Sequence, residues 1–397
     1  MKSPRLIVMG GGIGGLATAL AAASAGCEVQ VLEKSEHFAE LGAGLQLAPN
    51  ASRVLQELGI LDDVRKHACF PPRLVFMDAV TGNELTYIEA GAKFTERYGY
   101  PYFVVHRADL LDAEVAACRA RSSILLESSK EVTSIEQGRE DTETSVRVTC
   151  ADGSHYEADA LIGADGLWST ARKLITDQLP LCSEYVAYRG TTAPERIPRR
   201  EGLDNMTIWI GPELHLVQYP LRAGHVYNQV AVFRSHRYRP GMEAGDDWGT
   251  SEEFVEAFSK TCDYLRSSVP LLDHYRRWPM YFAWPLTSWT KGRVTLLGDA
   301  AHPMLQYLAQ GACQALEDAV CLGRELKAHG SDFATVFGNY ETARRPRTAR
   351  VQLSALKFGE MKHDPGLTGA LFRRLLEMRS PDDCSELDWL YAENANS

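Results

Sequence analysis

Residues 4–15 read Pro4-Arg-Leu-Ile-Val-Met-Gly-Gly-Gly-Ile-Gly-Gly15, an apolar run that passes directly into a glycine-rich turn. The run predicts a buried strand, and the alanine-rich residues 13–25 predict a helix. Gly10, Gly12 and Gly15 have the spacing GxGxxG. In that pattern the first glycine permits a tight turn, the second lets the backbone approach a pyrophosphate, and the third lets the helix pack on the strand. The stretch therefore predicts the start of a dinucleotide-binding α/β fold.

A carboxylate ends the next predicted strand. Residues 26–33 form an alternating run that finishes at Glu33, 23 residues after Gly10. This separation is typical of the acidic residue that bonds a nucleotide ribose. The glycine pattern alone is also compatible with a purely structural turn, but the two strands and Glu33 favour nucleotide binding. They do not distinguish FAD from NAD.

Composition and charge narrow the class of protein. The chain has 397 residues, 45% of them hydrophobic, and a net charge of −10. This charge disfavours nucleic acid as a partner, because phosphate contacts need basic faces. No apolar run approaches the roughly 20 residues of a membrane span, and residues 7–25 are too rich in glycine for a signal peptide. We therefore expect a cytoplasmic protein without a nucleic-acid or membrane partner.

Cysteine and histidine spacing argues against a metal site. The nine cysteines are scattered and form no CxxC pair. An odd, unclustered set favours reduced thiols over a disulfide framework or a zinc centre. His215 and His302 are isolated, without the spacing of metal ligands. We expect no metal.

The rest of the chain predicts a nucleotide-binding domain interrupted by a second domain. Aromatic, alternating segments between residues 183 and 290 are separated by Gly/Pro turns and predict an antiparallel sheet. Helical patterns are found at 49–58, 108–121, 252–260, 311–328 and 332–357. We expect the first domain to comprise residues 1–72, 106–182 and 291–397, the last part carrying C-terminal helices. The second domain would comprise strands in 73–105 and the sheet of 183–290.

Two further motifs follow predicted strands. Asp165-Gly-Leu-Trp-Ser-Thr-Ala-Arg172 comes after the apolar residues 160–164, and Leu297-Gly-Asp-Ala-Ala-His-Pro303 comes after residues 293–297. Ligands of open α/β sheets bind outside the carboxyl ends of the strands, where all three motifs are expected. Taken alone, the first of these two motifs is compatible with a helix-capping loop, and the second with a strand-end turn. Their order and spacing along one chain favour a functional site.

Together the three motifs resemble the fingerprint of the class A flavoprotein aromatic hydroxylases, and the resemblance covers nearly the whole chain. It implies an α/β fold like that of p-hydroxybenzoate hydroxylase, with a Rossmann-like FAD-binding domain, an inserted mixed or antiparallel substrate sheet and C-terminal helices. It also implies FAD as cofactor, NADH or NADPH as co-substrate, and hydroxylation of a phenolic acid by O2 through a flavin C4a-hydroperoxide. The flavin would supply the redox chemistry, while the protein orients the substrate and excludes water.

The resemblance implies which residues hold FAD. In the family, the motif at Asp165 serves both FAD and NAD(P)H, Asp299 bonds the ribityl chain, and Arg107 reaches the flavin phosphates. The helix that begins near Gly311 would stabilise negative charge on reduced flavin. Taken alone, Arg107 would be an ordinary surface arginine. The expected FAD contacts are Gly10, Gly12, Ile13, Gly14, Gly15, Glu33, Lys34, Gln46, Arg107, Val132, Asp165, Asp299, Gly311 and Ala312.

Three stretches indicate a narrower branch of the family. Residues 303–311 (PMLQYLAQG), 214–219 (LHLVQY) and 42–50 (GAGLQLAPN) resemble those of 3-hydroxybenzoate 6-hydroxylases. The 6-hydroxynicotinate 3-monooxygenases and the salicylate hydroxylases are close relatives of that group. By this resemblance, His215 and Gln306 would bond the phenol oxygen and activate the ring for para attack, giving 2,5-dihydroxybenzoate (gentisate).

The residues themselves support a role for a histidine. A phenol becomes far more reactive as a phenolate, and histidine accepts a proton near neutral pH. Strand alternation places His215, Val217 and Tyr219 on one face, which we expect to be the pocket floor. The alternatives without a catalytic role are a hydrogen-bonded core histidine at His215 and a capping or solvated side chain at Gln306. The expected substrate contacts are Tyr219, Val217, Tyr188 and Leu47.

Other functions stay open on the sequence alone. Within the branch, salicylate and 6-hydroxynicotinate are alternative substrates, although Gln306 weighs against the pyridine. A bulky apolar substrate would need an exposed apolar mouth, and no strongly amphipathic apolar segment stands out in the sequence. A non-oxygenating flavoprotein dehydrogenase would bind FAD equally well but show no oxygen consumption stimulated by an aromatic compound. A homodimer is the ordinary expectation for such an enzyme.

Overall fold

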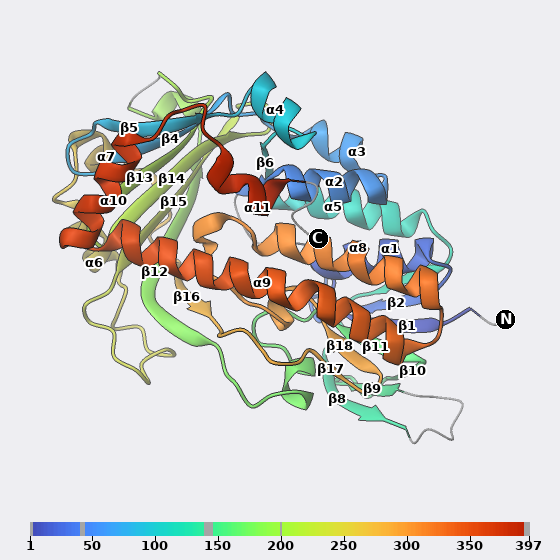
Figure 1. Ribbon diagram of the computed structural model, residues 1–397. Helices are drawn as coiled ribbons and strands as arrows, with labels where there is room; N and C mark the ends of the chain where they lie inside the picture. The colour runs from blue at the N-terminus through green and yellow to red at the C-terminus, as the bar shows by residue number, and fades with distance from the viewer. Residues whose placement is uncertain (1–2, 40–43, 139–145, 199–200, 393–397) are drawn as a thin grey trace.

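The structure is a computed structural model that describes residues 3–39, 44–138, 146–198 and 201–392. Two main sheets lie side by side, and the long helix α9 (Phe333–His363) from the C-terminal part of the chain runs past both (Figure 1). Of the stretch 42–50 used above, Gly42 and Ala43 lie outside the described residues. In the part of the chain that is described, no helix is both long and apolar enough to cross a membrane.

The first sheet has six strands in the order β17–β18–β11–β1–β2–β7. Neighbouring strands run parallel, except that β17 is antiparallel to β18. Its central strands are continuous apolar runs, as expected for a parallel sheet covered on both faces. The strands are β1 (Arg5–Met9), β2 (Glu28–Leu32), β7 (Ile124–Glu127), β11 (Ala160–Gly163), β17 (Thr290–Lys291) and β18 (Val294–Leu296).

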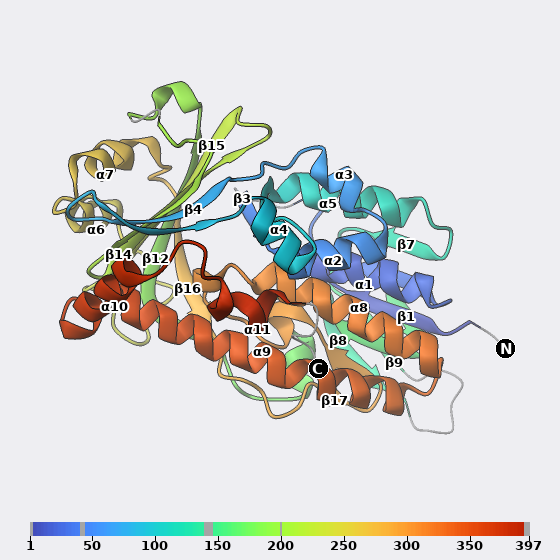
Figure 2. The same ribbon diagram turned by 45° about the horizontal axis from the view of Figure 1, so that its top comes forward.

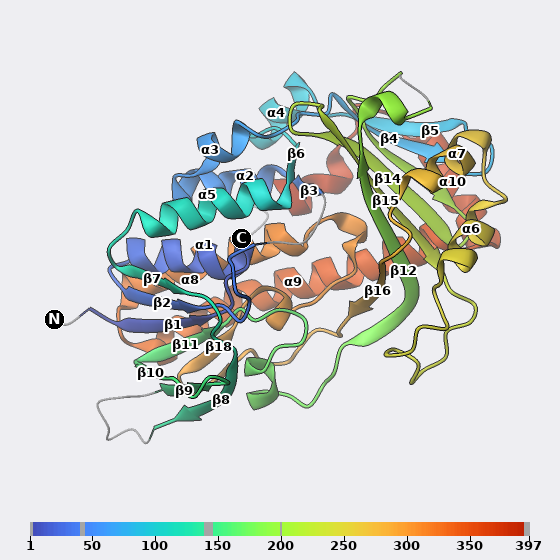
Figure 3. The same cartoon turned by 180° about the vertical axis from the view of Figure 1, so that it is seen from behind.

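Helices cover one face of this sheet and a small sheet covers the other (Figure 3). The helices are α1 (Ile13–Ser24) and α5 (Arg107–Arg119), and both contribute to the main hydrophobic core. The small sheet is formed by β8 (Val132–Gln137), β9 (Val146–Cys150) and β10 (His155–Ala158). A turn at Asp152-Gly153 joins β9 to β10, with Gly153 at φ +82°.

The second sheet has seven strands in the order β16–β12–β15–β14–β13–β4–β5. It is mixed, because β13 runs parallel to β4 while its other pairs are antiparallel. Two distant segments therefore build one sheet. The strands are β4 (Arg73–Asp78), β5 (Glu84–Glu89), β12 (Leu181–Thr192), β13 (Met206–Gly211), β14 (Leu214–Leu221), β15 (Val226–Arg234) and β16 (Arg277–Phe282).

The seven-stranded sheet has two different faces. Helices α6 (Ser251–Phe258) and α7 (Asp263–Ser268) pack on one of them, around the aromatic side chains of Trp248, Phe254 and Phe258 (Figure 2). The other face looks toward the first sheet and the C-terminal helices. A face turned toward the nucleotide-binding part of the chain is available to form a binding cavity between the two sheets.

A small two-stranded sheet and three helices connect the two main sheets. Strand β3 (Gly44–Leu47) pairs with β6 (Phe103–His106). Thus β6 does not join the seven-stranded sheet, although the sequence placed residues 73–105 with that domain. The boundaries of the two domains stay a prediction. The helices are α2 (Pro49–Leu58), α3 (Leu61–Arg65) and α4 (Ala92–Tyr98).

The C-terminal quarter is helical. It contains α8 (Gly311–His329), α9 (Phe333–His363), α10 (Leu367–Met378) and α11 (Asp388–Tyr391). On α10, Leu367, Leu371, Leu375 and Met378 are each more than half exposed. The expectation that no amphipathic apolar segment stands out is therefore wrong. The leucines recur every four residues, so helix formation gathers them on one side.

Candidate active site

A single cavity of about 1150 Å³ extends from the glycine turn after β1 to the inner face of the seven-stranded sheet. At one end its wall contains Gly12, Ile13 and Gly14, and at the other it contains His215 and Gln306. A cavity of this size suits a large cofactor together with a small substrate. All three sequence motifs contribute to its wall, as the parallel strand order predicts.

The glycine turn is shaped for close backbone contact. Gly10 has φ +113°, and a Cβ atom there would lie 2.3 Å from the carbonyl oxygen of Ala164, in the chain leading to the second motif. A Cβ atom on Gly15 would lie 2.0 Å from the Gly10 oxygen. The turn is therefore restricted to glycine at both positions. Helix α1 begins at Ile13, so its N-terminus and the turn amides form a site suited to a pyrophosphate.

Glu33 lies beside the same turn. Its carboxylate accepts hydrogen bonds from the backbone N–H of Gly11 at 2.7 Å and of Ser35 at 2.8 Å. This places an acidic group next to the first helix, at the end of β2, where the ribose carboxylate was expected. Its contact with a ribose stays a prediction. Lys34 follows on the exposed surface, away from the cavity wall.

A buried arginine joins the second motif to the third. Arg172 donates from Nε to the carbonyl oxygen of Ala300 at 2.7 Å, and from Nη1 to that of Leu167 at 3.1 Å. It also donates to the carbonyl oxygen of Asp299. Asp165 does not line the cavity. It accepts from Ser169 Oγ and from backbone amides of the turn that follows, so in this structure it acts as a capping residue.

The third motif leads into the N-terminus of α8. Asp299, Gly311 and Ala312 all line the cavity. The backbone of Gly311 lies close to Asp299, since an added Cβ would be 3.9 Å from Oδ1. Small residues at a helix start leave the amide groups and the positive end of the helix dipole accessible to a ligand. The glycine cradle, Asp299, Arg107 and this helix start together fit the groups of FAD that the resemblance implies.

The substrate end of the cavity is formed by one face of the seven-stranded sheet. His215, Val217 and Tyr219 of β14 all line it, as the alternation predicts. Gln306 lies in a 3₁₀ turn (Gln306–Leu308) between the third motif and α8, and also lines the cavity. The structure thus brings together both candidate catalytic residues and two of the four candidate substrate contacts.

The other two substrate candidates do not line the cavity. In the strand register, Tyr188 pairs with Ala231, which pairs with Leu216, so Tyr188 projects to the face opposite His215. There it stacks on Phe254, and its hydroxyl donates to the Gly249 carbonyl at 2.9 Å. The assignment of Tyr188 to the pocket was therefore wrong, because its neighbour on β12, and not Tyr188 itself, faces the cavity.

Leu47 and Val132 are likewise directed into the core. Leu47 is fully buried in the main hydrophobic core, and the neighbouring Gln46 lines the cavity instead. Successive side chains of a strand point to opposite sides, which accounts for the difference. Val132 lies in β8 with its side chain in the same core and away from the cavity wall. The assignment of a substrate contact to Leu47 is therefore wrong, and a cofactor contact of Val132 stays a prediction.

His215 is buried and held by a second histidine. Its Nδ1 lies 2.8 Å from Nε2 of His363, and the two rings are stacked with centroids 4.9 Å apart. Tyr307 contacts His215 edge-on, with ring centroids 5.5 Å apart. Burial, the nearby charge of Lys362 and then His363 hold the pKa of His215 well below its usual range. A neutral imidazole whose Nδ1–H donates a hydrogen bond has a lone pair on Nε2 that can accept a proton.

Gln46 and Tyr219 occupy the wall nearest β3. The hydroxyl of Tyr102 donates to Oε1 of Gln46 at 2.7 Å, which fixes the orientation of the amide. The ring of Tyr219 packs over the backbone of Gly44, where a Cβ atom would lie 2.3 Å from Cε2. Burial holds the pKa of Tyr219 above its usual range, so it is a neutral hydroxyl. Both groups offer hydrogen bonds without adding charge.

Sequence reasoning missed several residues of the wall. Arg189 lines the cavity because it pairs with Val230, which pairs with Val217, in the row next to His215. Alternation along β12 would have found it, had the strand face been assigned correctly. His363 and Lys362 come from the end of α9 and carry no recognisable motif. Only the folded chain brings them to the sheet.

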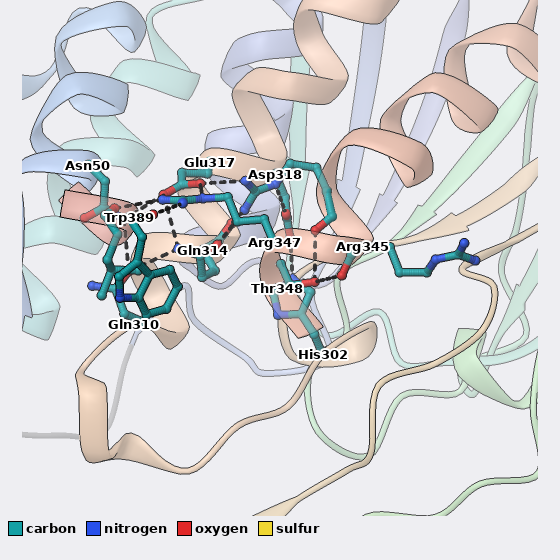
Figure 4. A network of polar contacts seen from close by, with 12 residues as sticks. Asn50, His302, Gln310, Gln314, Glu317, Asp318, Arg345, Arg347, Thr348 and Trp389 are labelled. Atoms are coloured by element: carbon teal, nitrogen blue, oxygen red, sulfur yellow. Dashed lines mark hydrogen bonds and ion pairs between the residues drawn. The ribbon is translucent and has the colours of Figure 1, made fainter. Parts of the chain in front are cut away.

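A buried polar network holds the N-terminal half of α8 in place. Glu317 and Asp318 of this helix bind Arg344 at 2.5 Å and 2.7 Å, and Glu317 also binds Arg347 at 2.6 Å. His302 of the third motif contacts Asp318 at 2.6 Å. Figure 4 shows this network, with Asn50, Gln310, Gln314 and Trp389 around it. His302 is thus a structural residue beside the cavity.

Charge pairing in the network is strong enough to overcome burial. Burial by itself would raise the pKa of Asp318, but His302 and Arg344 lower it to about 2. Arg344 and Arg347 similarly hold the pKa of Glu317 below its usual range, against the effect of burial. Both carboxylates are therefore ionised and paired. They fix the helix whose first turn lines the cavity.

Comparison with known proteins agrees with this geometry. A family model described as an FAD binding domain matches residues 4–354. That span includes the three motifs and all strands of both main sheets.

Similar proteins are known among curated sequences and solved structures. The chain is 38% identical over 391 residues to the 3-hydroxybenzoate 6-hydroxylase of Klebsiella oxytoca, covering 98% of this chain and 97% of that protein. Its fold is similar to that of Klebsiella pneumoniae HpxO complexed with FAD and uric acid, with a TM-score of 0.82, 26% identity, and coverage of 95% and 93% of the two chains. A salicylate hydroxylase substrate complex is also similar, with a TM-score of 0.81, 25% identity, and coverage of 98% and 95%.

Proposed function

The chain belongs to the FAD-binding-domain family of flavin-dependent aromatic hydroxylases, and from this premise we propose that it converts 3-hydroxybenzoate to gentisate. The reaction consumes 3-hydroxybenzoate, O2, NAD(P)H and a proton, and yields gentisate, NAD(P)⁺ and water. The observation that carries the proposal is the continuous cavity, which joins Asp299 and the start of α8 to His215 and Gln306. An aromatic ring held at the end of the cavity formed by the seven-stranded sheet would share one continuous cavity with the cofactor.

When bound, FAD would supply the redox chemistry that couples oxidation of NAD(P)H to the transfer of one oxygen atom of O2 to the aromatic ring. Gly10, Gly12 and Gly15 with the N-terminus of α1 would hold its pyrophosphate, and Asp299 its ribityl chain. The first turn of α8 would stabilise negative charge on the reduced ring system. The remaining steps depend on residues of the chain itself.

His215 and Gln306 act on the phenol. In the tautomer in which Nδ1–H of His215 donates to Nε2 of His363, Nε2 of His215 carries the lone pair that accepts the phenol proton. Gln306 would form a hydrogen bond with the same phenol oxygen and so help to orient the phenol group. A phenolate donates electron density to the ring position para to it, which favours attack there. Apolar neighbours such as Val217 and Ile208 exclude water from the reacting centre.

The choice of substrate rests on the likeness to relatives and on the pocket. The 3-hydroxybenzoate 6-hydroxylase named above is 38% identical over nearly the whole chain, against 25% for the salicylate hydroxylase. Basic groups in the wall, including Arg189 and Lys362, suit an aromatic acid better than a neutral phenol. Salicylate and 6-hydroxynicotinate are the substrates against which the proposal must be tested.

The decisive experiment measures three quantities on the purified FAD-loaded protein. NADH or NADPH oxidation, O2 uptake and product formation are followed with 3-hydroxybenzoate, salicylate and 6-hydroxynicotinate in parallel. We expect gentisate from 3-hydroxybenzoate, with nearly equal consumption of reduced nicotinamide and O2. Catechol from salicylate, with no product from 3-hydroxybenzoate, would instead identify a salicylate hydroxylase. Nicotinamide oxidation that no aromatic acid stimulates would contradict the proposal.

We further propose that the enzyme works in the cytoplasm as a homodimer. All nine cysteines are free thiols in the structure, which suits a reducing compartment. The exposed leucines of α10 form an apolar surface of the kind that subunit contacts cover. Light scattering in solution tests the dimer, and a monomeric mass would exclude it.

A further inference from the structure

Lys362 is a fully buried amine in the wall of the active-site cavity. It lies in the last turn of α9, whose end reaches the seven-stranded sheet (Figure 1), where the backbone N–H of Glu213 donates to the His363 carbonyl at 2.7 Å. The side chain is only 2% exposed and lines the cavity. Its Nζ lies 4.2 Å from the ring centroid of Tyr307 and 5.3 Å from that of Phe358.

Within the described residues, no acidic group pairs with Lys362. Its Nζ forms no ion pair and no hydrogen bond with any described residue, and it faces the rings of Tyr307 and Phe358. Burial holds the pKa of Lys362 well below its usual range, and no neighbouring charge opposes that effect. The other buried cations differ, because Arg344 and Arg347 are both paired with Glu317. A buried charge without a counterion is costly, so such a group is normally paired or serves a ligand.

The position of Lys362 fits the acidic end of a substrate ring. Lys362 and His215 both contact Tyr307, the residue after Gln306, so the amine and the phenol-binding groups surround one part of the cavity. The negative end of the α9 dipole also favours a cation at this helix end. A bound anion would therefore provide the counterion that Lys362 lacks among the described residues.

Other basic groups of the wall are engaged elsewhere. The guanidinium of Arg189 stacks on Trp278 at 4.9 Å, and that of Arg379 donates to the carbonyl oxygens of Tyr87 and Asp383. Arg107 begins α5, beside the β3–β6 pair and away from the end of α9. Among these cations, Lys362 combines complete burial with the absence of any acceptor in the described chain.

We propose that Lys362 is the carboxylate-binding residue of the active site, holding the acid group of the aromatic substrate through a charge-assisted hydrogen bond. The proposal rests on the proposed function, because it assumes an aromatic acid as substrate. It adds an anchor for the acid group, so the ring is fixed at two points: the phenol oxygen at His215 and Gln306, and the carboxylate at Nζ of Lys362. Fixing both groups selects which ring carbon is exposed to oxygen transfer.

The test compares a charged ligand with its neutral amide on the FAD-loaded protein. Titration with 3-hydroxybenzoate and with 3-hydroxybenzamide is followed by the change in flavin absorbance. Lys362→Met keeps the length and apolar stem of the side chain but removes the charge. We expect a roughly 10- to 100-fold weaker Kd for the benzoate, from loss of a hydrogen bond to a charged group, and a change below about threefold for the amide. Lys357→Met, an exposed position on the same helix, should change neither Kd.

Stability provides a second readout that does not depend on the ligand. Because an unpaired buried amine is unfavourable, ligand-free Lys362→Met should melt at the same temperature as the wild type or higher. Saturating 3-hydroxybenzoate should raise the melting temperature of the wild type more than that of the variant. If Lys362→Met does not fold, Lys362→Gln serves the same comparison.

The outcomes separate the two proposals. Equal weakening of benzoate and benzamide binding would overturn the subsite, since it would mean that Lys362 only packs. Unchanged benzoate binding in the variant would overturn it too, while leaving the proposed function intact. If the wild type binds salicylate and not 3-hydroxybenzoate, the proposed substrate is wrong, and selective loss for salicylate over salicylamide still supports Lys362. If the wild type binds no aromatic acid, both proposals fail.

Discussion

The proton affinity of His215 is set by three features of its surroundings, namely burial, the Lys362 amine and His363. All three disfavour the charged form, so the pKa lies below 6.5 and the imidazole is neutral at any pH above it. At neutral pH His215 is therefore unprotonated and has a nitrogen lone pair available to the phenol hydroxyl. It would lose that lone pair only when the pH falls beneath its lowered pKa.

This reasoning predicts a pH profile. The acid limb of kcat/KM that belongs to His215 should lie below pH 6.5, the usual value for histidine. His363→Leu removes the hydrogen bond that orients His215 and should lower kcat roughly tenfold, the scale of one buried hydrogen bond. His363→Gln can supply an amide group to Nδ1 and should retain more activity. FAD content, read from absorbance, should be equal in all three proteins.

Two results would contradict the assignment. An acid limb that remains at or above pH 6.5 would mean that His215 is not the titrating base. Equal kcat in the leucine and glutamine variants would mean that His363 only fills space.

For single residues, the sequence correctly predicted which side chains face the cavity where this depends only on alternation within one strand. His215, Val217 and Tyr219 follow from the period of β14 alone. Tyr188 was misplaced because the face of β12 depends on its register with β15, which is a tertiary property. Lys362 could not be predicted from sequence, because it lies in a polar helix about 60 residues beyond the third motif.

At the scale of elements, the turn that carries Gln306 is positioned by α9. The ring of Tyr307 lies against Gly359 of that helix, where a Cβ atom would be 2.1 Å from Cε2. Only a glycine at this point lets the turn approach the helix so closely. The position of Gln306 therefore depends on a residue more than 50 positions away.

Paired glycine substitutions on α9 test this contact. Gly359→Ala should displace Tyr307 and lower kcat by roughly tenfold or more, since a shift of about 1 Å in a positioning group can cost 10²-fold. It should also destabilise the protein by overpacking, by about 1–3 kcal/mol. Gly338→Ala is the matched control, because nothing lies within 4 Å of its added Cβ. There the better helix propensity should stabilise the protein by up to about 1 kcal/mol.

The measurements are steady-state kinetics, FAD content and denaturant unfolding of both variants. If Gly359→Ala retains wild-type kcat, the turn does not depend on this contact. A kcat loss in Gly338→Ala of the same size would point to a general effect of α9 instead.

Long elements with clear periodicity could be predicted, and short ones set by packing could not. The helix expected at 49–58 is α2, ended by Gly59 with φ +77° as a helix C-terminus favours. Helices α3, α4 and α7 have seven residues or fewer and were not predicted. Strand β6 was predicted, but its partner β3 was not, because pairing between distant segments leaves little local pattern.

At the scale of the whole molecule, the parallel order of the first sheet explains why three distant motifs meet. Strands β1, β11 and β18 are parallel neighbours, so the chain leaves each of them at the same edge. The seven-stranded sheet closes the other side of the cavity. The long helix α9 then connects the two ends, since it carries Arg344 and Arg347 of the buried network and, at its end, Lys362 and His363.

The buried network should therefore contribute to global stability, and its weakest point is the loss of one cation. Arg344→Met leaves Asp318 and Glu317 buried with less positive charge, which should cost about 3–5 kcal/mol in the apparent free energy of unfolding at pH 7. Arg324→Met removes an exposed arginine, 66% accessible in its pair with Glu57, and should cost less than about 1 kcal/mol.

The pH dependence gives the sign of the effect. The pKa of Asp318 is about 2 in the folded protein, below its usual value of 3.8, so its contribution to stability is present above 3.8 and is lost as the pH falls from 3.8 toward 2. Without Arg344, the carboxylates become easier to protonate, and protonation removes the unpaired charge. The stability difference between wild type and Arg344→Met should therefore shrink as the pH is lowered below 4. Urea unfolding of both proteins between pH 7 and 3 measures this stability difference. A difference that stays constant across that range would show that charge pairing is not the reason why Arg344 stabilises the protein.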